Sequence, residues 1–347
     1  MYFCSKIITI FLISKINLVI LSLSTKKYNI KIWNILQKCV SLQTILRNNN
    51  GYLYMKHYLQ LIRPIQWIKN IFVFAPIFFS NHLLEIDYLL PTTIIFFSFC
   101  LVSSSIYCFN DLIDVEADRH HPQKCHRPIA SGLISIRGGY IMMTICMLGS
   151  IALLTLVRNQ NTLFLYIILI SYWLMNIGYT LRLKQVAIID VTIIATGFVM
   201  RVLIGGLTTD VWVSQWLILM TFLLTLFMAI AKRGDDFTIF ENTGIKPRQS
   251  ITGYNKGFIN GANSIIVAVT IVCYIMYTMS NEVIERIGSQ YLYLTSVWVL
   301  LALLRYLQKT IVYGYSGDPT KLLTKDLFIQ LCVLGWIVSF FIIIYLH

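Results

Sequence analysis

The sequence predicts an all-α integral membrane protein. Hydrophobic residues make up 57% of its 347 residues and charged residues 12%, against about 25% charged residues in an ordinary soluble domain. The apolar residues occur in runs of about 20, the length that crosses a bilayer as a helix, whereas the strands of a barrel carry only alternating apolarity. This pattern excludes a soluble single domain, a secreted disulfide framework and a nucleic-acid-binding protein.

Apolar windows predict about nine membrane spans joined by loops of alternating charge. The loops after the second, fourth, sixth and eighth spans carry 15 Lys and Arg residues, counting one at the end of the eighth span, and the other loops carry 2. By the positive-inside rule the basic loops are expected to face the cytoplasm, so the net charge of +13 reflects topology. The predicted spans are 66–83, 88–109, 139–157, 162–180, 186–207, 212–231, 261–280, 289–305 and 327–346.

Residues 1–54 differ in kind from the rest of the chain. They contain seven Lys and Arg residues and no acidic residue. Their apolar stretch at 7–23 is interrupted by Lys15 and lacks the small-residue cleavage site of a signal peptide. We interpret residues 1–54 as a basic N-terminal extension and 55–347 as the catalytic domain, with translation from Met55 at least as plausible as translation from Met1.

The cysteines and histidines do not predict a metal site. The eight cysteines form no CxxC pair, and most lie in apolar runs, where cysteine behaves as a small hydrophobe. His120, His121 and His126 share one loop, but their spacing matches no zinc-ligand pattern. A polar, solvated loop explains these histidines better than a metal site.

The strongest chemical signal follows the second span, where four of the fifteen acidic residues fall within 111–118. On a helix Asp111, Asp114 and Asp118 are spaced i, i+3 and i+7, so they share one face. Because like charges repel, this face favours a divalent cation, and carboxylates that leave room for water and phosphate are typical of a Mg²⁺ site presented to a diphosphate. The alternative is a solvated acidic helix end.

Basic residues continue this loop. Arg119, Lys124 and Arg127 follow the acidic residues directly. Such neighbours are expected where phosphate oxygens bridge a metal ion and cationic side chains.

The segment that begins at Asn110 and ends at Asp118 resembles the first aspartate-rich motif, NDxxDxxxD, of the UbiA superfamily of membrane prenyltransferases. The resemblance covers roughly residues 55–347, and the number of predicted spans agrees with the helical bundle of that superfamily. It implies a UbiA-like bundle of about nine transmembrane helices with cytoplasmic active-site loops.

Within the superfamily, the chain resembles the decaprenyl-phosphate phosphoribosyltransferase branch at further points. Residues 63–76 resemble its opening RPxQWxKNxxVFAP, in which Lys69 and Asn70 either reach a phosphate or anchor the span at the interface. The second DxxxD motif of the quinone-forming branch is absent, and 232–236 resembles the element KRxxE, with Asp236 in the place of the glutamate. Residues 305–326 resemble the C-terminal pattern of the branch, which we interpret as a structural loop.

Two charged residues fall inside the fifth predicted span. Asp190 and Arg201 are eleven residues apart, which is about three turns and some 16 Å, so they share a helix face. An arginine at this depth is costly if it faces lipid, so Arg201 is expected to face a polar cavity or a carboxylate. Contact with a ligand and a structural ion pair both remain open.

The resemblance implies transfer of 5-phosphoribose from 5-phosphoribosyl 1-diphosphate to a polyprenyl phosphate in the cell (inner) membrane, with Mg²⁺ as cofactor. A phosphate monoester is anionic at neutral pH and needs no general base, but the leaving diphosphate needs charge stabilisation. The expected catalytic residues are Asn110, Asp111, Asp114 and Asp118, and of these the three aspartates are expected to bind the metal ion. The expected substrate-binding residues are Lys69, Asn70, Lys124, Arg127, Tyr179, Lys184, Asp190, Arg201, Lys232, Arg233, Asp236 and Tyr254.

Two other functions compete with this interpretation. Transfer of a prenyl chain from its diphosphate to an aromatic acceptor predicts a second carboxylate motif, which the sequence lacks. A transporter or channel predicts charged residues along a path through the membrane, for which Asp190 and Arg201 are the only strong candidates.

Overall fold

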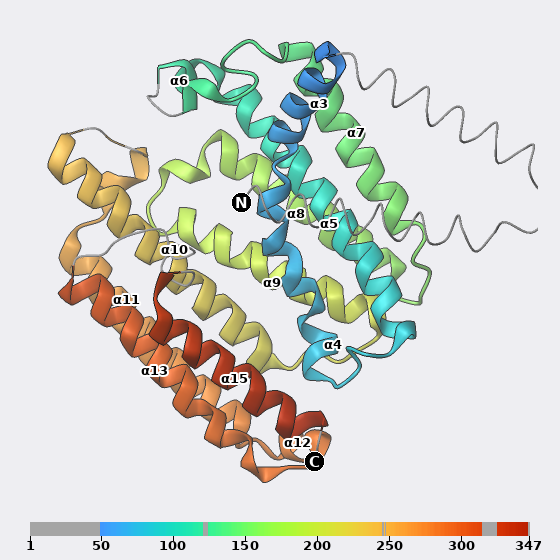
Figure 1. Ribbon diagram of the computed structural model, residues 1–347, viewed down its shortest axis with the longest axis vertical. Coiled ribbons are helices and arrows are strands. Elements are labelled where there is room, and N and C mark those ends of the chain that lie inside the picture. The colour runs from blue at the N-terminus through green and yellow to red at the C-terminus, as the bar shows by residue number, and fades with distance from the viewer. Residues whose placement is uncertain (1–48, 121–123, 245, 247, 314–324, 346–347) are drawn as a thin grey trace, which may run out of the picture. The chain divides into compact units, whose positions relative to one another are not determined.

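The protein is all-helical over the residues that the computed structural model describes, which are 49–120, 124–244, 246, 248–313 and 325–345 (Figure 1). The chain divides into two compact units, Met1–Lys56 and His57–His347. The helix α3 (Asn49–Ile62) crosses this boundary, and every later helix belongs to the second unit.

Among the described residues, seven segments are long and apolar enough to cross a membrane, and two shorter apolar segments accompany them. The first short segment consists of η1 (Pro64–Phe74) followed directly by α4 (Ala75–Phe79). The second lies in α15 (Leu327–Tyr345). These nine segments correspond to the nine predicted spans, and the chain is an all-α membrane protein. The long segments are α5 (Ile86–Ile113), α7 (Ile136–Leu154), α8 (Thr162–Leu181), α9 (Ile189–Thr209), α10 (Gln215–Thr243), α11 (Lys256–Thr278) and Gln290–Val312, which comprises η5 (Gln290–Thr295), α13 (Ser296–Leu307) and the π-helix η6 (Gln308–Val312).

Short helices form the connections between the long ones. They are α6 (Val115–Arg119), η2 (Lys124–His126), η3 (Leu183–Gln185), η4 (Gln249–Gly253) and α12 (Asn281–Ile287). Capping residues fix the ends of several of the long helices. The side chains of Ser135, Ser214 and Asn255 each accept a hydrogen bond from the first turn of α7, α10 and α11, respectively, and Gly244 ends α10 in the left-handed conformation that glycine adopts readily.

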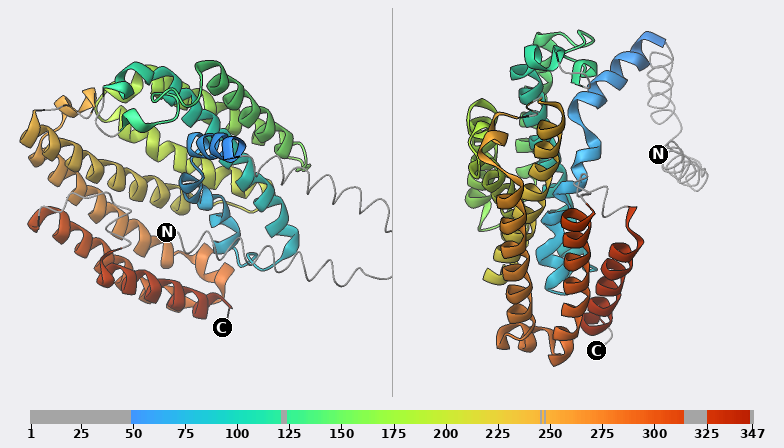
Figure 2. Two further views of the ribbon diagram at one scale, coloured as in Figure 1. Left: turned by 45° about the horizontal axis from the view of Figure 1, so that its top comes forward. Right: turned by 90° about the vertical axis from the view of Figure 1, so that its left-hand side faces the viewer.

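The long helices pack as two groups that meet between α9 and α10 (Figures 1 and 2). In the first group α5 packs against α7, α8, α9 and η1, and in the second α11 packs against α10 and α13, and α13 against α15. Each group has its own apolar core, the first around Phe99 and Leu169 and the second around Phe227 and Ile259. The boundary between the groups brings the loops after α8 and α10 together, because η3 contacts η4.

One glycine allows η1 to approach α9 closely. A Cβ atom on Gly205 would lie 2.1 Å from the carbonyl oxygen of Val73, well inside van der Waals contact. Small residues are common where membrane helices cross closely, because they let the backbones come together. Gly205 therefore fixes the position of η1, which carries Asn70, against α9, which carries Arg201.

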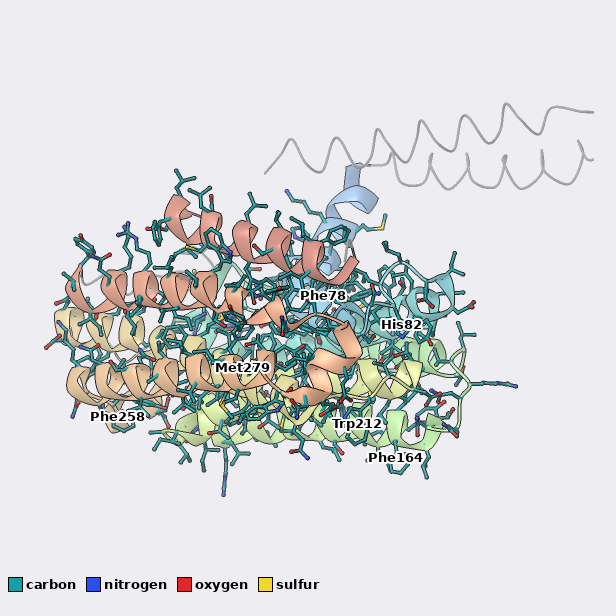
Figure 3. All side chains as sticks on the ribbon, turned by 90° about the horizontal axis from the view of Figure 1, so that it is seen from below. Phe78, His82, Phe164, Trp212, Phe258 and Met279 are labelled. Atoms are coloured by element: carbon teal, nitrogen blue, oxygen red, sulfur yellow. The ribbon has the colours of Figure 1, made fainter. Side chains whose placement is uncertain are left out.

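The loops of the bundle gather at two opposite ends. Figure 3 shows His82, Phe164 and Trp212, which lie before or at the start of α5, α8 and α10, on one side, and Phe258, near the start of α11, on the other. The helices α5 and α10 have 28 and 29 residues, more than the roughly 20 that a bilayer requires. Both helices begin at the His82 end, so their last turns lie at the Phe258 end. Asn110 and Asp111 are in the last turn of α5, and 232–236 are in the second half of α10.

Candidate active site

The three aspartates of the acidic motif lie where α5 ends and α6 begins. The helix α5 ends at Ile113, Asp114 has φ −89° and ψ 7°, and α6 starts at Val115. The single continuous helix face expected from the sequence is therefore interrupted at Asp114. Asp111 and Asp118 are buried and Asp114 is half-buried, so the three carboxylates contact different partners.

Two arginines bind the buried carboxylates. Arg63, just before η1, places Nη2 2.6 Å from Asp111 Oδ1. Arg127 donates from Nη1 to Asp111 Oδ1 at 3.1 Å and to Asp118 Oδ2 at 2.6 Å, and so joins the two aspartates. Charge-assisted hydrogen bonds of this kind are about twice as strong as neutral ones. Arg63 and Arg127 thus offset the repulsion between two carboxylates that are each about 2% exposed.

Lys184 binds the third carboxylate. Its Nζ donates to both oxygens of Asp114, at 2.7 and 2.9 Å. Lys184 lies in η3, directly after α8, and is separated from Asp114 by 70 positions in the chain. This pair therefore fixes the loop after α8 against the acidic motif.

The acidic motif has oxygen atoms that suit a magnesium ion. Asp111 Oδ2 and Asn110 Oδ1 are buried and have no hydrogen-bond partner among the described residues, which is costly unless a ligand or ion binds them. No three Cys, His, Asp or Glu side chains in the described part of the chain lie close enough to form a metal site by themselves. Mg²⁺ usually takes one or two protein carboxylates and completes its octahedral shell with phosphate and water. The residues fit such a site, and ligation by all three aspartates stays a prediction.

Lys124 adds a further positive charge beside the acidic motif. It begins η2 and is half-buried. Burial lowers the pKa of Lys124 from its usual value, the positive charges of Arg127 and Arg248 lower it further, and Asp118 and Asp114 act in the opposite direction. The residues that act on Lys124 come from the loops after α5 and α10, so these two loops meet at this position.

A second polar cluster surrounds Asp190, in the first turn of α9. Asp190 is fully buried, and its Oδ2 accepts hydrogen bonds from Arg233 Nε at 2.7 Å and from Ser250 Oγ at 3.1 Å. The Tyr254 hydroxyl donates to Asp190 Oδ1 at 2.7 Å and accepts from the backbone N–H of Ile188, also at 2.7 Å. Burial raises the pKa of Tyr254, so this phenol stays protonated. The structure therefore places Tyr254 as a buried support for Asp190.

The acid of the KRxxD element is shared between two arginines. Asp236 Oδ2 lies 3.0 Å from Arg233 Nη1 and 3.3 Å from Arg248 Nε. Arg248 also donates from Nη1 to the hydroxyl of Tyr179 on α8, at 3.0 Å. The carboxylate of Asp236 is thus bound by two arginine side chains, whereas the acids of a second DxxxD motif would face a metal ion.

Arg201 lies in a separate buried cluster and does not pair with Asp190. It donates to Asn70 Oδ1, Gly197 O and the Tyr172 hydroxyl, at 2.7, 2.6 and 2.7 Å. Its guanidinium also lies over the rings of Phe99, Tyr172 and Phe198 at 4.9–5.7 Å. The carboxylate of Asp190 is bound by Arg233 instead. Arg201 therefore does not face the polar cavity or carboxylate expected from the sequence, and ligand contact of either residue stays a prediction. Arg201 forms no ion pair within the described residues.

Several expected site residues lie away from these clusters. Lys69 and Lys232 are exposed, on η1 and α10, and Lys232 makes no hydrogen bond or ion pair with a described residue. Adjacent helix positions point about 100° apart, so Lys232 faces away from the side that buries Arg233. Asn70 is 1% exposed and donates to Cys100 Sγ at 3.3 Å, so it serves the Arg201 cluster rather than an open surface.

The C-terminal pattern lies apart from the site, and some of the expected features fall outside the described residues. Arg305 and Lys309 both bind Asp326, which accepts from the backbone N–H of Ile329 in the first turn of α15. This arrangement supports the interpretation of the C-terminal pattern as structural, although 316–319 lie outside the described residues. His121 and residues 1–48 also lie outside them. An apolar cavity of about 330 Å³ between α9 and α10 is lined by none of the expected site residues.

Arg63 and Arg248 were not among the site residues expected from the sequence. Arg63 is the first residue of the motif at 63–76, and it binds Asp111 and lies over the Tyr107 ring at 5.2 Å. It also has φ 52° and ψ 62°, a conformation that costs a non-glycine residue on the order of 1 kcal/mol. Nothing in the sequence signals this conformation, because the partner aspartate lies 48 positions away.

Comparison with known proteins identifies relatives over most of the chain. The profile of the UbiA prenyltransferase family matches residues 71–332. The decaprenyl-phosphate phosphoribosyltransferase of Mycolicibacterium smegmatis is 32% identical over 290 residues, which cover 80% of this chain and 89% of that protein. The decaprenyl-phosphate phosphoribosyltransferase of Corynebacterium glutamicum is 28% identical over 290 residues, covering 83% and 86%.

Solved structures share the fold. A UbiA homolog from Archaeoglobus fulgidus, bound to DMAPP and Mg²⁺, superposes with a TM-score of 0.61 at 17% identity and covers 84% of this chain and 99% of that one. At this identity the likeness concerns the helical bundle alone. Together with the family match over residues 71–332 and the acidic motif at the end of α5, it shows that this chain belongs to the UbiA prenyltransferase family and is a multi-pass membrane transferase.

Proposed function

We propose that the protein transfers 5-phosphoribose from 5-phosphoribosyl 1-diphosphate to a polyprenyl phosphate, in a reaction that requires Mg²⁺. The products are polyprenylphosphoryl-5-phosphoribose and diphosphate. The two phosphoribosyltransferases described above, at 32% and 28% identity, support this choice of donor and acceptor.

The observation that carries the proposal is the number of cationic side chains that contact the two acidic regions. The second region is bound by Arg233 and Arg248, and the first by Arg63, Arg127 and Lys184. The first also has buried oxygens on Asn110 and Asp111 without hydrogen-bond partners among the described residues. A site with one metal-diphosphate face and additional cations suits two phosphorylated substrates better than it suits a prenyl diphosphate and a neutral aromatic acceptor.

The reaction follows from these charges. An oxygen of the lipid phosphate attacks C1 of the ribose, and the bond from C1 to the diphosphate oxygen breaks as the ring develops positive charge. The acceptor is already ionised, so no side chain has to remove a proton. A bound Mg²⁺ supplies Lewis-acid stabilisation of the leaving diphosphate. Asn110 and Asp111 would hold the ion, with Asp114 and Asp118 nearby.

The cations then divide the phosphate groups between them. Arg127, Lys124 and Lys184 lie beside the acidic motif and assist binding of the diphosphate. Arg233, Asp190 and the other buried members of their cluster hold the loop after α10 in place. Substrate contacts of Asn70 and Arg201 would require a rearrangement of their buried cluster. Lys69 and Lys232 are exposed and would need no such rearrangement.

We further propose that the site faces the cytoplasm in the cell membrane, as the distribution of basic loops indicates. The catalytic domain is proposed to comprise residues 55–347. A chain that starts at Met55 is therefore expected to retain transferase activity, which a membrane fraction from cells expressing this shorter chain can test.

The experiment that tests the proposal uses purified full-length protein, Mg²⁺, labelled 5-phosphoribosyl 1-diphosphate and a polyprenyl phosphate. Label is expected in the lipid extract and is expected to disappear with EDTA. A heat-inactivated sample controls for transfer without the enzyme. If no label enters the lipid, but a polyprenyl diphosphate and an aromatic acceptor react, the protein is a prenyltransferase and the proposal is wrong.

A further inference from the structure

Arg248 occupies a central position between the two acidic regions. It precedes η4, in the loop after α10, and its side chain is about one-third exposed. Its Nε contacts Asp236 on α10 and its Nη1 contacts Tyr179 on α8. The positive charge of Arg248 also acts on Lys124, in the loop after α5. One loop arginine thus stands where the ends of three long helices meet.

The contacts of Arg248 leave part of its guanidinium available. Asp236 is its only carboxylate partner among the described residues, and Asp236 shares the same oxygen with Arg233. An arginine has five N–H donors, and the Nη2 group makes no hydrogen bond with a described residue. The side chain is about one-third exposed, so this Nη2 group is accessible to a bound anion.

The chemistry of the available group favours a phosphate. The planar fork of arginine matches two oxygens of a phosphomonoester, and a nearby lysine adds a point charge. Lys124 is such a lysine. Burial and the positive charges of Arg127 and Arg248 disfavour its charged form, while Asp118 and Asp114 favour it. A bound dianion at this corner would interact with Arg248 and Lys124 together.

We propose that Arg248 binds a phosphomonoester group of the substrates, separate from the diphosphate that the acidic motif holds. The inference rests on the proposed function, which supplies two phosphomonoesters: the 5-phosphate of the donor and the phosphate of the lipid acceptor. A purely structural Arg248, which only ties the loop to α10, would affect both substrates without distinguishing their phosphates.

The test compares wild-type protein with Arg248→Gln, Arg248→Lys and the control Lys246→Gln. Lys246 is an exposed cation of the same loop whose recorded contact is with the Phe240 ring. Calorimetric titration of the full-length protein in detergent, with Mg²⁺ and without transfer, gives dissociation constants for three ligands. These are 5-phosphoribosyl 1-diphosphate, its analogue that lacks the 5-phosphate, and a short polyprenyl phosphate. Elution of each variant as a monodisperse peak confirms folding.

If Arg248 binds the 5-phosphate, Arg248→Gln weakens binding of the complete donor roughly tenfold or more, as expected for one charge-assisted hydrogen bond. Binding of the analogue then stays as in the wild type, and Arg248→Lys restores part of the loss. If Arg248 binds the lipid phosphate, the loss appears with the polyprenyl phosphate instead. Either result supports the inference, provided that Lys246→Gln leaves all three constants unchanged.

Equal losses for the complete donor and the analogue, alone or together with a loss for the lipid phosphate, would overturn the inference and leave Arg248 a structural residue. No loss for any ligand would overturn it as well. Because these are binding measurements, they decide the role of Arg248 even if wild-type protein fails to label the lipid. Failure of the labelling experiment counts against the proposed function, whereas the analogue comparison counts for or against Arg248 alone.

Discussion

Replacing Arg233 by glutamine is expected to destabilise the folded protein by about 3 kcal/mol. The side chains of Arg233 and Asp190 are 1% and 0% exposed, and Nε lies 2.7 Å from Oδ2. Breaking a buried ion pair costs about 3–5 kcal/mol, because one charge is left buried without its partner. We take the lower value because Asp190 keeps hydrogen bonds from Ser250 and Tyr254.

The adjacent Lys232 provides the matched control. It is exposed, so Lys232→Gln is expected to change the free energy of unfolding by no more than about 0.5 kcal/mol. The assay is thermal unfolding of both full-length variants in the same detergent at one scan rate. The midpoint for Arg233→Gln should fall by roughly 4 °C relative to the wild type, while that of Lys232→Gln should not.

A double variant tests whether Asp190 and Arg233 stabilise the protein as a pair. Asp190→Asn alone leaves Arg233 with only Asp236, so it should also destabilise the protein. Combining Asp190→Asn with Arg233→Gln should cost less than the sum of the two single losses, because the double variant buries no unpaired charge at this point. Equal midpoints for Arg233→Gln and Lys232→Gln would refute the structural role of this ion pair and reopen the region as a ligand site.

Three further outcomes follow from the structure. Asp111→Asn should reduce Mg²⁺-dependent phosphoribosyl transfer on the order of a hundredfold, and full activity in the labelling assay would remove Asp111 from the metal site. Because the pKa of Lys124 is lowered, its ammonium group loses its proton at a pH below the usual 10.5. As the pH is increased, the KM for the donor should therefore begin to rise before pH 10.5 is reached. Lys124→Arg should flatten this profile, and an unchanged profile would contradict the assignment. Gly205→Ala places a Cβ 2.1 Å from the Val73 carbonyl and should lower the midpoint of thermal unfolding, whereas Gly261→Ala, which has open space, should not.

Much of the fold was predictable because the bilayer constrains it strongly. A helix must satisfy its own backbone hydrogen bonds in lipid and needs about 20 apolar residues to cross. The predicted spans therefore match observed helices to within a few residues in most cases, as for 162–180 and Thr162–Leu181. The largest difference is at the sixth span, predicted as 212–231, because α10 continues to Thr243.

The acidic motif itself was also evident from the sequence, because scarce acidic residues are concentrated in 111–118. Its local geometry was predicted less well. A regular helix would present Asp111, Asp114 and Asp118 on one face, but the helix ends at Ile113 and Lys184 draws Asp114 to a different partner. Spacing rules hold only while the backbone stays helical, and the pull of a distant cation is absent from any local pattern.

The sequence by itself determined the class of the protein, its spans, its probable family and the location of its first acidic motif, since these depend on composition and local spacing. The tertiary structure decided the pairing of charges. Arg63 with Asp111, Asp190 with Arg233 and Arg248 with Tyr179 join positions 43 to 69 residues apart. Such pairs form because a buried charge needs an opposite charge or a hydrogen bond nearby, and which of the many available residues supplies it depends on how the helices pack.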